Sequence, residues 1–412
     1  MKKILAALVA VVFMGGVVFA QNTSTVTQSS SNNTANVNQT GSNQNSSVLQ
    51  EGGNSNTTSV TQTETISNPP YTAQQNSTVI QNGASNKATV SQTETGGGGH
   101  STNSAYIEQI GNNNLSTQST NAPGSNSGQS VWGYQNGNNN ILHQTWTAGY
   151  TNSFKTTVNG SSNTVNQSGH ANHSHGFVDI TGNNNQASQS LTGSNQGYSG
   201  GIHIYQTGNW NSASQTFSGS GLGHNQKGTV TQTGDHNIAN QNSNGPDNQL
   251  FATQTGNYNT ANQTVDGAST KANSDVSGNS NTTKQTSTGD NDNTYVEIYG
   301  NNNSTTENQS AGDGNNSFNY INGSSNVIKV TQQGNNNTSG TSNSDFGIYQ
   351  DGSYDTAILN QYGDFNINTI LQSGGNYNTA KVYQGTSALP SNSNVSSVTQ
   401  TGSSNTTTVT QH

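Results

Sequence analysis

The chain contains 412 residues, no cysteine and a formal net charge of −9 at pH 7. Only 25% of the residues are hydrophobic and 7% are charged, whereas glycine alone occurs 48 times. A globular domain with a bulky apolar core is excluded, because so few apolar side chains cannot offset the entropy lost when the chain is ordered. Two classes remain: a polar disordered chain, and a repeat protein whose layers are held by ladders of polar side chains.

Residues 1–20 have the pattern of a secretory signal peptide. Lys2 and Lys3 precede an apolar run, and Val18 and Ala20 are the small residues that a cleavage site requires. The run is shorter than the about 20 apolar residues of a membrane span, so a lone membrane anchor is the weaker alternative. We therefore expect cleavage after Ala20 and a secreted, extracellular protein.

The rest of the chain has no arginine and remains acidic. Nucleic-acid binding requires basic stripes on the protein surface, so the sequence predicts no nucleic-acid partner. Because cysteine is absent, no disulfide framework supports the fold after export.

A short motif, Gln-x-Gly-x-x-Asn, returns along the whole chain. In ILNQYGDFNINTILQSGGNYNTAKVYQ, residues 358–384, Gln361 and Gln372 are each followed two residues later by glycine and then by asparagine. From Gln232 to Ile298 the spacing between copies stays at 22 residues. A period that is kept over many copies is typical of a solenoid and conflicts with a disordered chain.

Each copy predicts a strand, a tight turn and a second strand. In GIHIYQ, Ile202, Ile204 and Gln206 fall on one face and His203 and Tyr205 on the other, which is the period of a half-buried β-strand. The glycine supplies the positive φ of a tight reversal, and the asparagine-rich step tolerates left-handed backbone. A second, more variable loop leads to the next copy.

Glutamine and asparagine suit the inward face of such a stack, because a primary amide carries a donor and an acceptor and bonds to an identical amide one layer away. Stacked like charges repel, which explains the low charge content. We predict a self-assembly ladder of these glutamines: Gln81, Gln92, Gln109, Gln135, Gln206, Gln232, Gln254, Gln332, Gln350, Gln361, Gln372, Gln384, Gln400 and Gln411. The asparagines predicted for the ladder are Asn86, Asn114, Asn140, Asn185, Asn259, Asn303, Asn366, Asn378 and Asn405. The turn glycines are Gly83, Gly111, Gly137, Gly182, Gly208, Gly234, Gly256, Gly300, Gly334, Gly363 and Gly402.

The middle of the chain varies this pattern. Between Asn114 and Asn281 glutamine follows asparagine by four residues instead of six. In five copies an aliphatic residue replaces the first glutamine: Val158, Ile180, Val276, Ile298 and Ile321. Both spacings are even, so glutamine stays on the inner face, although the continuity of the ladder comes into question. The variation divides the chain after the signal peptide into N-terminal repeats with longer loops (21–128), middle repeats of 22–26 residues (129–310) and C-terminal repeats (311–412).

The motif resembles the curlin repeat, S-x5-Q-x-G-x-x-N-x-A-x3-Q, of the subunits of curli, the extracellular amyloid fibres of bacterial biofilms. The most similar copies are STVIQNGASNKATVSQ (77–92), SYDTAILNQYGDFNINTILQ (353–372), NYNTAKVYQ (376–384) and VSSVTQTGSSNTTTVTQ (395–411). The resemblance implies a secreted structural subunit of biofilm fibres that functions in cell adhesion. It also implies two partners besides the chain itself, a nucleating minor subunit and an outer-membrane secretion channel, and does not distinguish a major subunit from a minor one.

We therefore predict an all-β fold, a cross-β-like β-solenoid of stacked strand–turn–strand repeats (β-arches) with about 16–18 layers. The sequence shows no capping element at either end, so both ends are expected to template further copies, giving a homopolymer. The alternative is a soluble β-solenoid, either an ice-binding protein or a cell-surface adhesin, that does not polymerise.

Neither catalysis nor a cofactor is predicted, because the few carboxylates fall mostly in turns and no nucleophile, base and orienting group come together. His170, His173 and His175 form a weak candidate metal site. The segment GHANHSHG that contains them is more simply a polar loop between repeats, because it has no carboxylate or thiol partner.

Overall fold

The computed structural model describes residues 21–65, 74–95, 102–123, 128–147, 151–170, 173–193, 201–219, 226–342 and 345–412. The predicted signal peptide, residues 1–20, lies outside the described residues. Within the described ranges no helix is long and apolar enough to cross a membrane.

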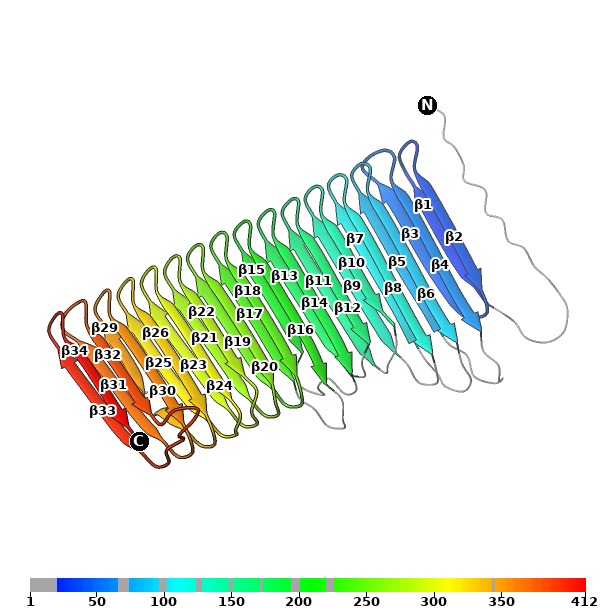
Figure 1. The fold of residues 1–412 in the computed structure, drawn as a ribbon. Coiled ribbons are helices and arrows are strands. Elements are labelled where there is room, and N and C mark those ends of the chain that lie inside the picture. Colours follow the sequence, from blue (N-terminus) through cyan, green and yellow to red (C-terminus); the bar gives the residue numbers. More distant parts are fainter. Residues whose placement is uncertain are drawn as a thin grey trace.

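The described chain forms a straight rod of two facing parallel β-sheets, with the N-terminal strands at one end and the C-terminal strands at the other (Figure 1). Successive strands alternate between the sheets, so each turn of the chain adds one strand to each sheet. The second sheet has 16 strands, which gives 16 layers. The prediction of an all-β solenoid of stacked strand–turn–strand repeats is therefore confirmed.

The first sheet takes the odd-numbered strands, with one irregular layer near its C-terminal end. Its strands are β1 (Thr23–Gln28), β3 (Gln44–Glu51), β5 (Gln74–Asn82), β7 (Thr102–Ile110), β9 (Gln129–Asn136), β11 (Asn152–Asn159), β13 (His175–Thr181), β15 (Ile202–Thr207), β17 (Lys227–Thr233), β19 (Gln249–Thr255), β21 (Lys271–Ser277), β23 (Asn293–Tyr299), β25 (Asn316–Asn322), β27 (Thr338–Ser342), β28 (Asp345–Phe346), β29 (Ile348–Asp351), β31 (Ile367–Ser373) and β33 (Val395–Thr401).

The second sheet is formed by even-numbered strands. They are β2 (Thr34–Thr40), β4 (Thr57–Thr65), β6 (Lys87–Thr95), β8 (Leu115–Pro123), β10 (Ile141–Trp146), β12 (Thr164–His170), β14 (Gln186–Gly193), β16 (Ser212–Gly219), β18 (Ile238–Asn244), β20 (Thr260–Asp266), β22 (Thr282–Ser287), β24 (Ser304–Ser310), β26 (Val327–Gln333), β30 (Thr356–Tyr362), β32 (Thr379–Gln384) and β34 (Thr406–Gln411).

The core lies between the sheets, and the strands alternate in burial as the sequence predicts. In β17 the side chains of Val230 and Gln232 are buried, whereas Thr229 and Thr231 lie on the outer face. The interior is narrow, so a large side chain requires a glycine beside it. A Cβ on Gly169 would lie 2.0 Å from the ring of Trp146, and one on Gly176 would lie 2.6 Å from the ring of Phe154.

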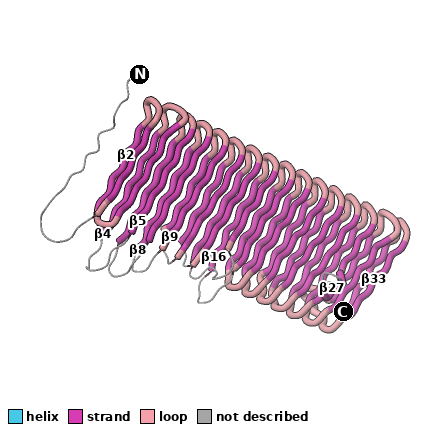
Figure 2. Tube along the Cα trace, turned by 180° about the vertical axis from the view of Figure 1, so that it is seen from behind, coloured by secondary structure: helices cyan, strands magenta, loops and turns pink. Residues whose placement is uncertain are grey.

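Tight turns lead from the first sheet to the second, and we call their stack the first corner. It runs along the whole rod as a regular edge, visible in Figure 2. At the turn that contains Gly182, the glycine has a φ of +128°, and an added Cβ would lie 1.8 Å from the carbonyl oxygen of Gly208 in the next layer. Glycine is required there both by its own backbone and by the close approach of its neighbour.

The connections from the second sheet back to the first form the second corner, and they change along the chain. Before β17 these connections vary in length, from three residues between β2 and β3 to eight residues between β4 and β5. From β18 onward several are equally tight, with backbone N–H groups at Ser269 and Asn291 bonded to carbonyls one layer away. A layer then consists of two similar half-turns, which explains why Gln361 and Gln372 lie only 11 residues apart: they end a second-sheet strand and a first-sheet strand.

One layer departs from the regular pattern. β27 pairs in parallel with β25 and β31 only at Thr338 and Ser339, and then turns outward to pair antiparallel with β28. β29 resumes the regular stacking. The excursion brings the ring of Phe346 against those of Tyr295 and Tyr320, and Phe318 beneath it is only 5% exposed.

The glycine turns generate a prediction that compares the middle of the rod with its end. Gly182→Ala is expected to destabilise the chain by about 2–3 kcal/mol, because it combines backbone strain with a clash against the next layer. Gly402 also has a positive φ, +86°, but no atom lies within 4 Å of an added Cβ. Gly402→Ala should therefore lower the free energy of unfolding by only about 1 kcal/mol. Urea unfolding of freshly dispersed monomers measures both, and equal costs would contradict the role assigned to the neighbouring layer.

Candidate functional site: amide ladders and two open ends

The longest glutamine ladder in the core consists of eight stacked glutamines in the second sheet. The Nε2 of the first seven donates to the Oε1 of the glutamine one layer nearer the C-terminus, at 2.7–2.9 Å. Most also donate to a main-chain carbonyl of the first sheet, as Gln215 does to His203 at 3.1 Å. The ladder therefore links layers along the rod and sheets across it. Its members are Gln118, Gln144, Gln167, Gln189, Gln215, Gln241, Gln263 and Gln285.

These eight residues are missing from the predicted ladder. They carry the signal of glutamine four residues after asparagine, and the structure shows what that shift builds. Gln92 pairs in register with Thr120, whereas Gln118 takes the position of Val90 in the layer before. The ladder thus moves to a neighbouring inward column and continues there for eight layers, exchanging places with aliphatic side chains.

The predicted glutamines lie at the expected inward positions, in both sheets. In the first sheet, unbroken Gln–Gln bonds of 2.8–2.9 Å join three groups, which are separated by Val158 and Ile180 and by Val276, Ile298 and Ile321. The first-sheet members are Gln81, Gln109, Gln135, Gln206, Gln232, Gln254, Gln350, Gln372 and Gln400. The second-sheet members are Gln92, Gln332, Gln361, Gln384 and Gln411.

An asparagine ladder runs along the first corner. The Asn114 backbone N–H donates to Oδ1 of Asn86 at 2.9 Å, and Asn114 Nδ2 donates to the Gly137 carbonyl at 2.8 Å, so each amide contacts the layer on either side. The predicted members on this corner are Asn86, Asn114, Asn140, Asn185, Asn259, Asn303, Asn378 and Asn405, and Asn163, Asn211, Asn237, Asn281 and Asn326 extend the ladder between them.

Asn366 belongs to a separate ladder on the second corner, where its N–H donates to Asn337 at 3.1 Å and its Oδ1 accepts from the N–H of Asn394 at 3.1 Å. Gly334 and Gly363 are also second-corner residues, because they follow the second-sheet strands β26 and β30. The motif in the sequence is the same at both corners, so spacing alone does not separate them.

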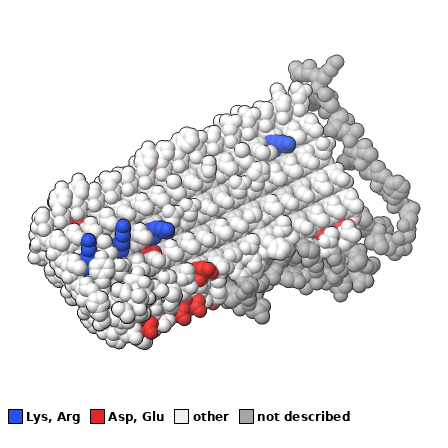
Figure 3. Space-filling model, in the orientation of Figure 1, with Lys and Arg blue, Asp and Glu red and all other residues white. Residues whose placement is uncertain are grey.

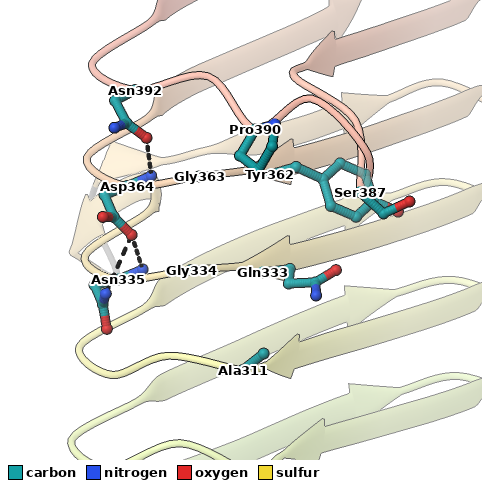
Figure 4. A pocket seen from close by; sticks show the side chains of 10 residues that line it. All are labelled: Ala311, Gln333, Gly334, Asn335, Tyr362, Gly363, Asp364, Ser387, Pro390 and Asn392. Carbon is teal, nitrogen blue, oxygen red and sulfur yellow. Dashed lines mark hydrogen bonds between the residues drawn. The ribbon is translucent and has the colours of Figure 1, made fainter.

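The outer rim of the second corner carries a further ladder (Figure 4). The Asn335 N–H donates to Oδ1 of Asp364 at 2.7 Å, and the Asp364 N–H donates to Oδ1 of Asn392 at 2.8 Å. Beside them, Tyr362 and Pro390 help to line an open pocket of about 370 Å³. Turn residues outside the core are therefore also held layer to layer.

Carboxyl groups replace amides at a few ladder positions. Glu307 ends the eight-glutamine ladder, where it is fully buried and accepts hydrogen bonds from Gln285 at 3.2 Å, from Ser317 at 3.0 Å and from Asn319. Burial raises the pKa of Glu307 to about 8, and the three hydrogen bonds act in the opposite direction by lowering it. The group is therefore largely neutral at pH 7, and an acid in this state is nearly isosteric with glutamine.

Asp355 takes an asparagine position on the first corner. Its buried Oδ2, in the place of an asparagine Nδ2, has no hydrogen-bond partner. Burial raises the pKa of Asp355, and of Asp292 in the second-corner ladder. A protonated carboxyl restores the donor that an amide supplies.

The candidate metal site at His170, His173 and His175 finds no support in the geometry. Nδ1 of His170 lies 3.1 Å from Thr147 Oγ1, and Nδ1 of His175 lies 2.8 Å from Ser153 Oγ. Among the described residues no group of three His, Cys, Asp or Glu side chains is arranged to hold a metal ion.

The strands β1, β2 and β34, at the two ends of the rod, are more exposed than the interior strands, whereas the inward residues of β33 are buried. Every residue of β1 is exposed, and Val26 is 39% exposed although the equivalent Val48 in the next layer is 1% exposed. At the other end the inward residues of β34 are half-buried. The strands β1, β2, β33 and β34 each have a hydrogen-bonded neighbour on one edge only, and the other edge pairs with no described strand. Both ends of the described rod therefore present open sheet edges.

The ladder generates a prediction with an internal control. Gln215→Glu replaces two donated hydrogen bonds by contacts between acceptors in a fully buried site, and should destabilise the chain by about 3 kcal/mol or more at neutral pH. Thr216→Glu places the same charge on the exposed neighbour and should change stability by about 0.5 kcal/mol or less. Urea midpoints of the two variants measure the difference, and equal midpoints would refute the ladder's contribution.

Glu307 generates a prediction for pH dependence. Its folded pKa of about 8 exceeds its ordinary value of 4.5, so its stabilising contribution is complete below about pH 4.5 and is lost as the pH rises towards about 8. Glu307→Gln should remove this part of the pH dependence, whereas Glu297→Gln on the outer face of the same layer should retain it. Urea midpoints across this pH range test the assignment, which fails if the wild-type and Glu307→Gln curves are parallel.

Comparison with known families supports this reading of the repeat. The model of the curlin associated repeat matches residues 30–63, which span β2, β3 and most of β4. No curated protein matches the chain. The family and the fold are those of a structural protein and correspond to no known enzyme family. The match lies in register with the stacked copies that follow it, so a curlin associated repeat at residues 30–63 continues into the same stack, which supports the curlin-repeat family.

Proposed function

We propose that this protein is a secreted structural subunit that assembles end to end into extracellular, curli-like amyloid fibres of a biofilm matrix, where it supports adhesion. One observation carries the proposal: the open C-terminal layer presents inward side chains that match those of the open N-terminal layer, position by position. The proposal makes the chain its own principal partner.

The match holds in both sheets. In the first sheet, β33 offers Ser396, Val398 and Gln400, and β1 offers Ser24, Val26 and Gln28 in the same order. In the second sheet, β34 offers Thr407, Val409 and Gln411. There β2 offers Ala35, Val37 and Gln39. The apolar column and both glutamine columns would therefore continue across the joint without a change of register.

The hydrogen bonds also have a direction that favours this joint. Each glutamine Nε2 donates towards the C-terminal layer, as Gln28 does to Gln50 and Gln372 does to Gln400. The C-terminal end therefore has donors without an acceptor one layer on, and the N-terminal end has the acceptors Gln28 Oε1 and Gln39 Oε1. Head-to-tail docking brings these donors to these acceptors and continues the ladders, whereas head-to-head docking opposes acceptor to acceptor.

The remaining parts of the proposal rest on the resemblance and on residues 1–20. Export through a cleaved signal peptide and an outer-membrane channel delivers the chain to the cell surface, and a nucleating minor subunit starts the fibre. The mirrored ends apply equally to a major subunit and to a nucleator, since both add layers to the same stack.

The joint is tested with variants that block one end each. Val26→Lys places a charge on the N-terminal face, and Val409→Lys, at a half-buried position of β34, places one on the C-terminal face, so each variant alone is expected to stay monomeric. Mixed in equal amounts, they should form a dimer through the two intact ends, whereas the wild type forms filaments. Sedimentation velocity and electron microscopy follow the species, and fibre diffraction should show cross-β spacings of about 4.8 and 10 Å.

Matched controls place the same charge on neighbouring outward positions. Thr25→Lys and Thr408→Lys should form filaments like the wild type, because neither side chain enters the joint. A wild-type chain that stays monomeric at high concentration would overturn the proposal, and thermal hysteresis in that monomer would favour the ice-binding alternative. Filaments from both blocked variants would show that the joint lies elsewhere.

A further inference from the structure

A row of lysines on the outer face of the second sheet has no part in the proposed joint. Lys284, Lys329 and Lys381 occupy one column, and Thr306 and Ile358 lie between them in register. The lysines thus recur at every second layer, about 10 Å apart for two strand spacings. Figure 3 shows them as a row near the C-terminal end of the face in view.

Between Lys284 and Lys329 the surface is hollowed into a trough of about 360 Å³. The short side chain of Thr306 lies between the two longer lysines, and Thr286, Asn308 and Thr331 line the adjoining column. The two ammonium groups are accompanied by hydroxyls and an amide, all of which can donate hydrogen bonds. The trough is therefore suited to an anionic ligand that also carries hydroxyl groups.

The outer face of this sheet offers the lysines no counter-charge. From β22 to β34 its outward positions hold Thr, Ser, Asn, Gln, Val, Ile and Tyr besides the lysines, and no carboxylate. Glu307 lies beneath the trough with its side chain in the core, where burial raises its pKa to about 8, so it is largely neutral at pH 7. A protein of net charge −9 thus carries a local basic strip.

We propose that the Lys284–Lys329–Lys381 strip binds a linear acidic polysaccharide, with its carboxylates on the lysines and its hydroxyls on the Thr and Asn floor of the trough. This inference goes beyond the proposed function and does not depend on it, because the strip is complete in a single chain. A straight row along the rod fits an extended polymer better than a compact anion. The lysine spacing is close to the length of two sugars in an extended chain.

Charge density favours a polysaccharide over nucleic acid. Duplex DNA carries one charge per about 1.7 Å and is bound by dense arrays of basic residues. Three lysines separated by neutral layers, on an acidic chain, match a polymer of lower charge density. If copies stack end to end, the strip recurs once per subunit, and a long polymer gains affinity by engaging several strips.

The test measures binding of the full chain, freshly dispersed as monomer, to immobilised polygalacturonate at low salt by biolayer interferometry. The triple variant Lys284→Gln, Lys329→Gln, Lys381→Gln should lose about tenfold or more in affinity. The control triple Lys87→Gln, Lys227→Gln, Lys271→Gln changes the net charge equally but leaves the strip intact, and should stay within about twofold of the wild type. Circular dichroism confirms the β-structure of each variant.

A third variant tests the spacing. Thr306→Lys with Lys329→Thr keeps three lysines but places two in adjacent layers and fills the trough, and should weaken binding several-fold. Equal loss in the two triple variants would reduce the effect to net charge and overturn the site. If the wild-type chain does not bind polygalacturonate, or binds single-stranded DNA more tightly at matched charge concentration, the choice of ligand is wrong. None of these outcomes depends on whether filaments form.

Discussion

The structure depends on one constraint: every side chain in the stack has a near-equivalent neighbour about 4.8 Å above and below it. Only groups that tolerate a copy of themselves at that distance are stable there. A primary amide satisfies this condition because its donor meets the acceptor of the next amide, and the eight-glutamine ladder shows the result. Aliphatic columns satisfy it by dispersion, and glycine satisfies it at the turns by allowing backbones to meet.

The same constraint explains where charge occurs. The acids that take amide positions in the core ladders, Asp292, Glu307 and Asp355, have raised pKa values, and none of them has a carboxyl in the adjacent layer of its own ladder. Carboxyl groups do meet in adjacent layers elsewhere, as Glu64 and Glu94 do in register between β4 and β6. On the outer face the three lysines alternate with uncharged residues, which doubles their separation. The low charge content is therefore a consequence of the stacked architecture.

The sequence was sufficient to predict the strand–turn–strand repeat, because alternation and glycine spacing are local properties. It did not assign each copy to a corner: Gln-x-Gly-x-x-Asn has the same local chemistry after either sheet, and Asn366 and Asn378 differ only in the layer contacts they make.

The ladder from Gln118 to Gln285 was not predicted as a unit for a related reason. Its continuity depends on register between strands 22–26 residues apart, whereas the curlin-type motif indicates the column that lies six residues after asparagine. The outward excursion of β27 and β28 follows from tertiary packing of Phe346 on Tyr295 and Tyr320, which no local pattern encodes.

The common direction of the glutamine side chains has a consequence for the rod as a whole. All the Gln–Gln bonds point the same way, so the dipoles of the amides add along the axis instead of cancelling, as peptide dipoles add along an α-helix. One extremity is left slightly positive and the other slightly negative. The two ends of the rod are thus electrostatically distinct before any partner binds. We therefore expect the two ends to bind an incoming molecule at different rates, so that one end grows faster than the other.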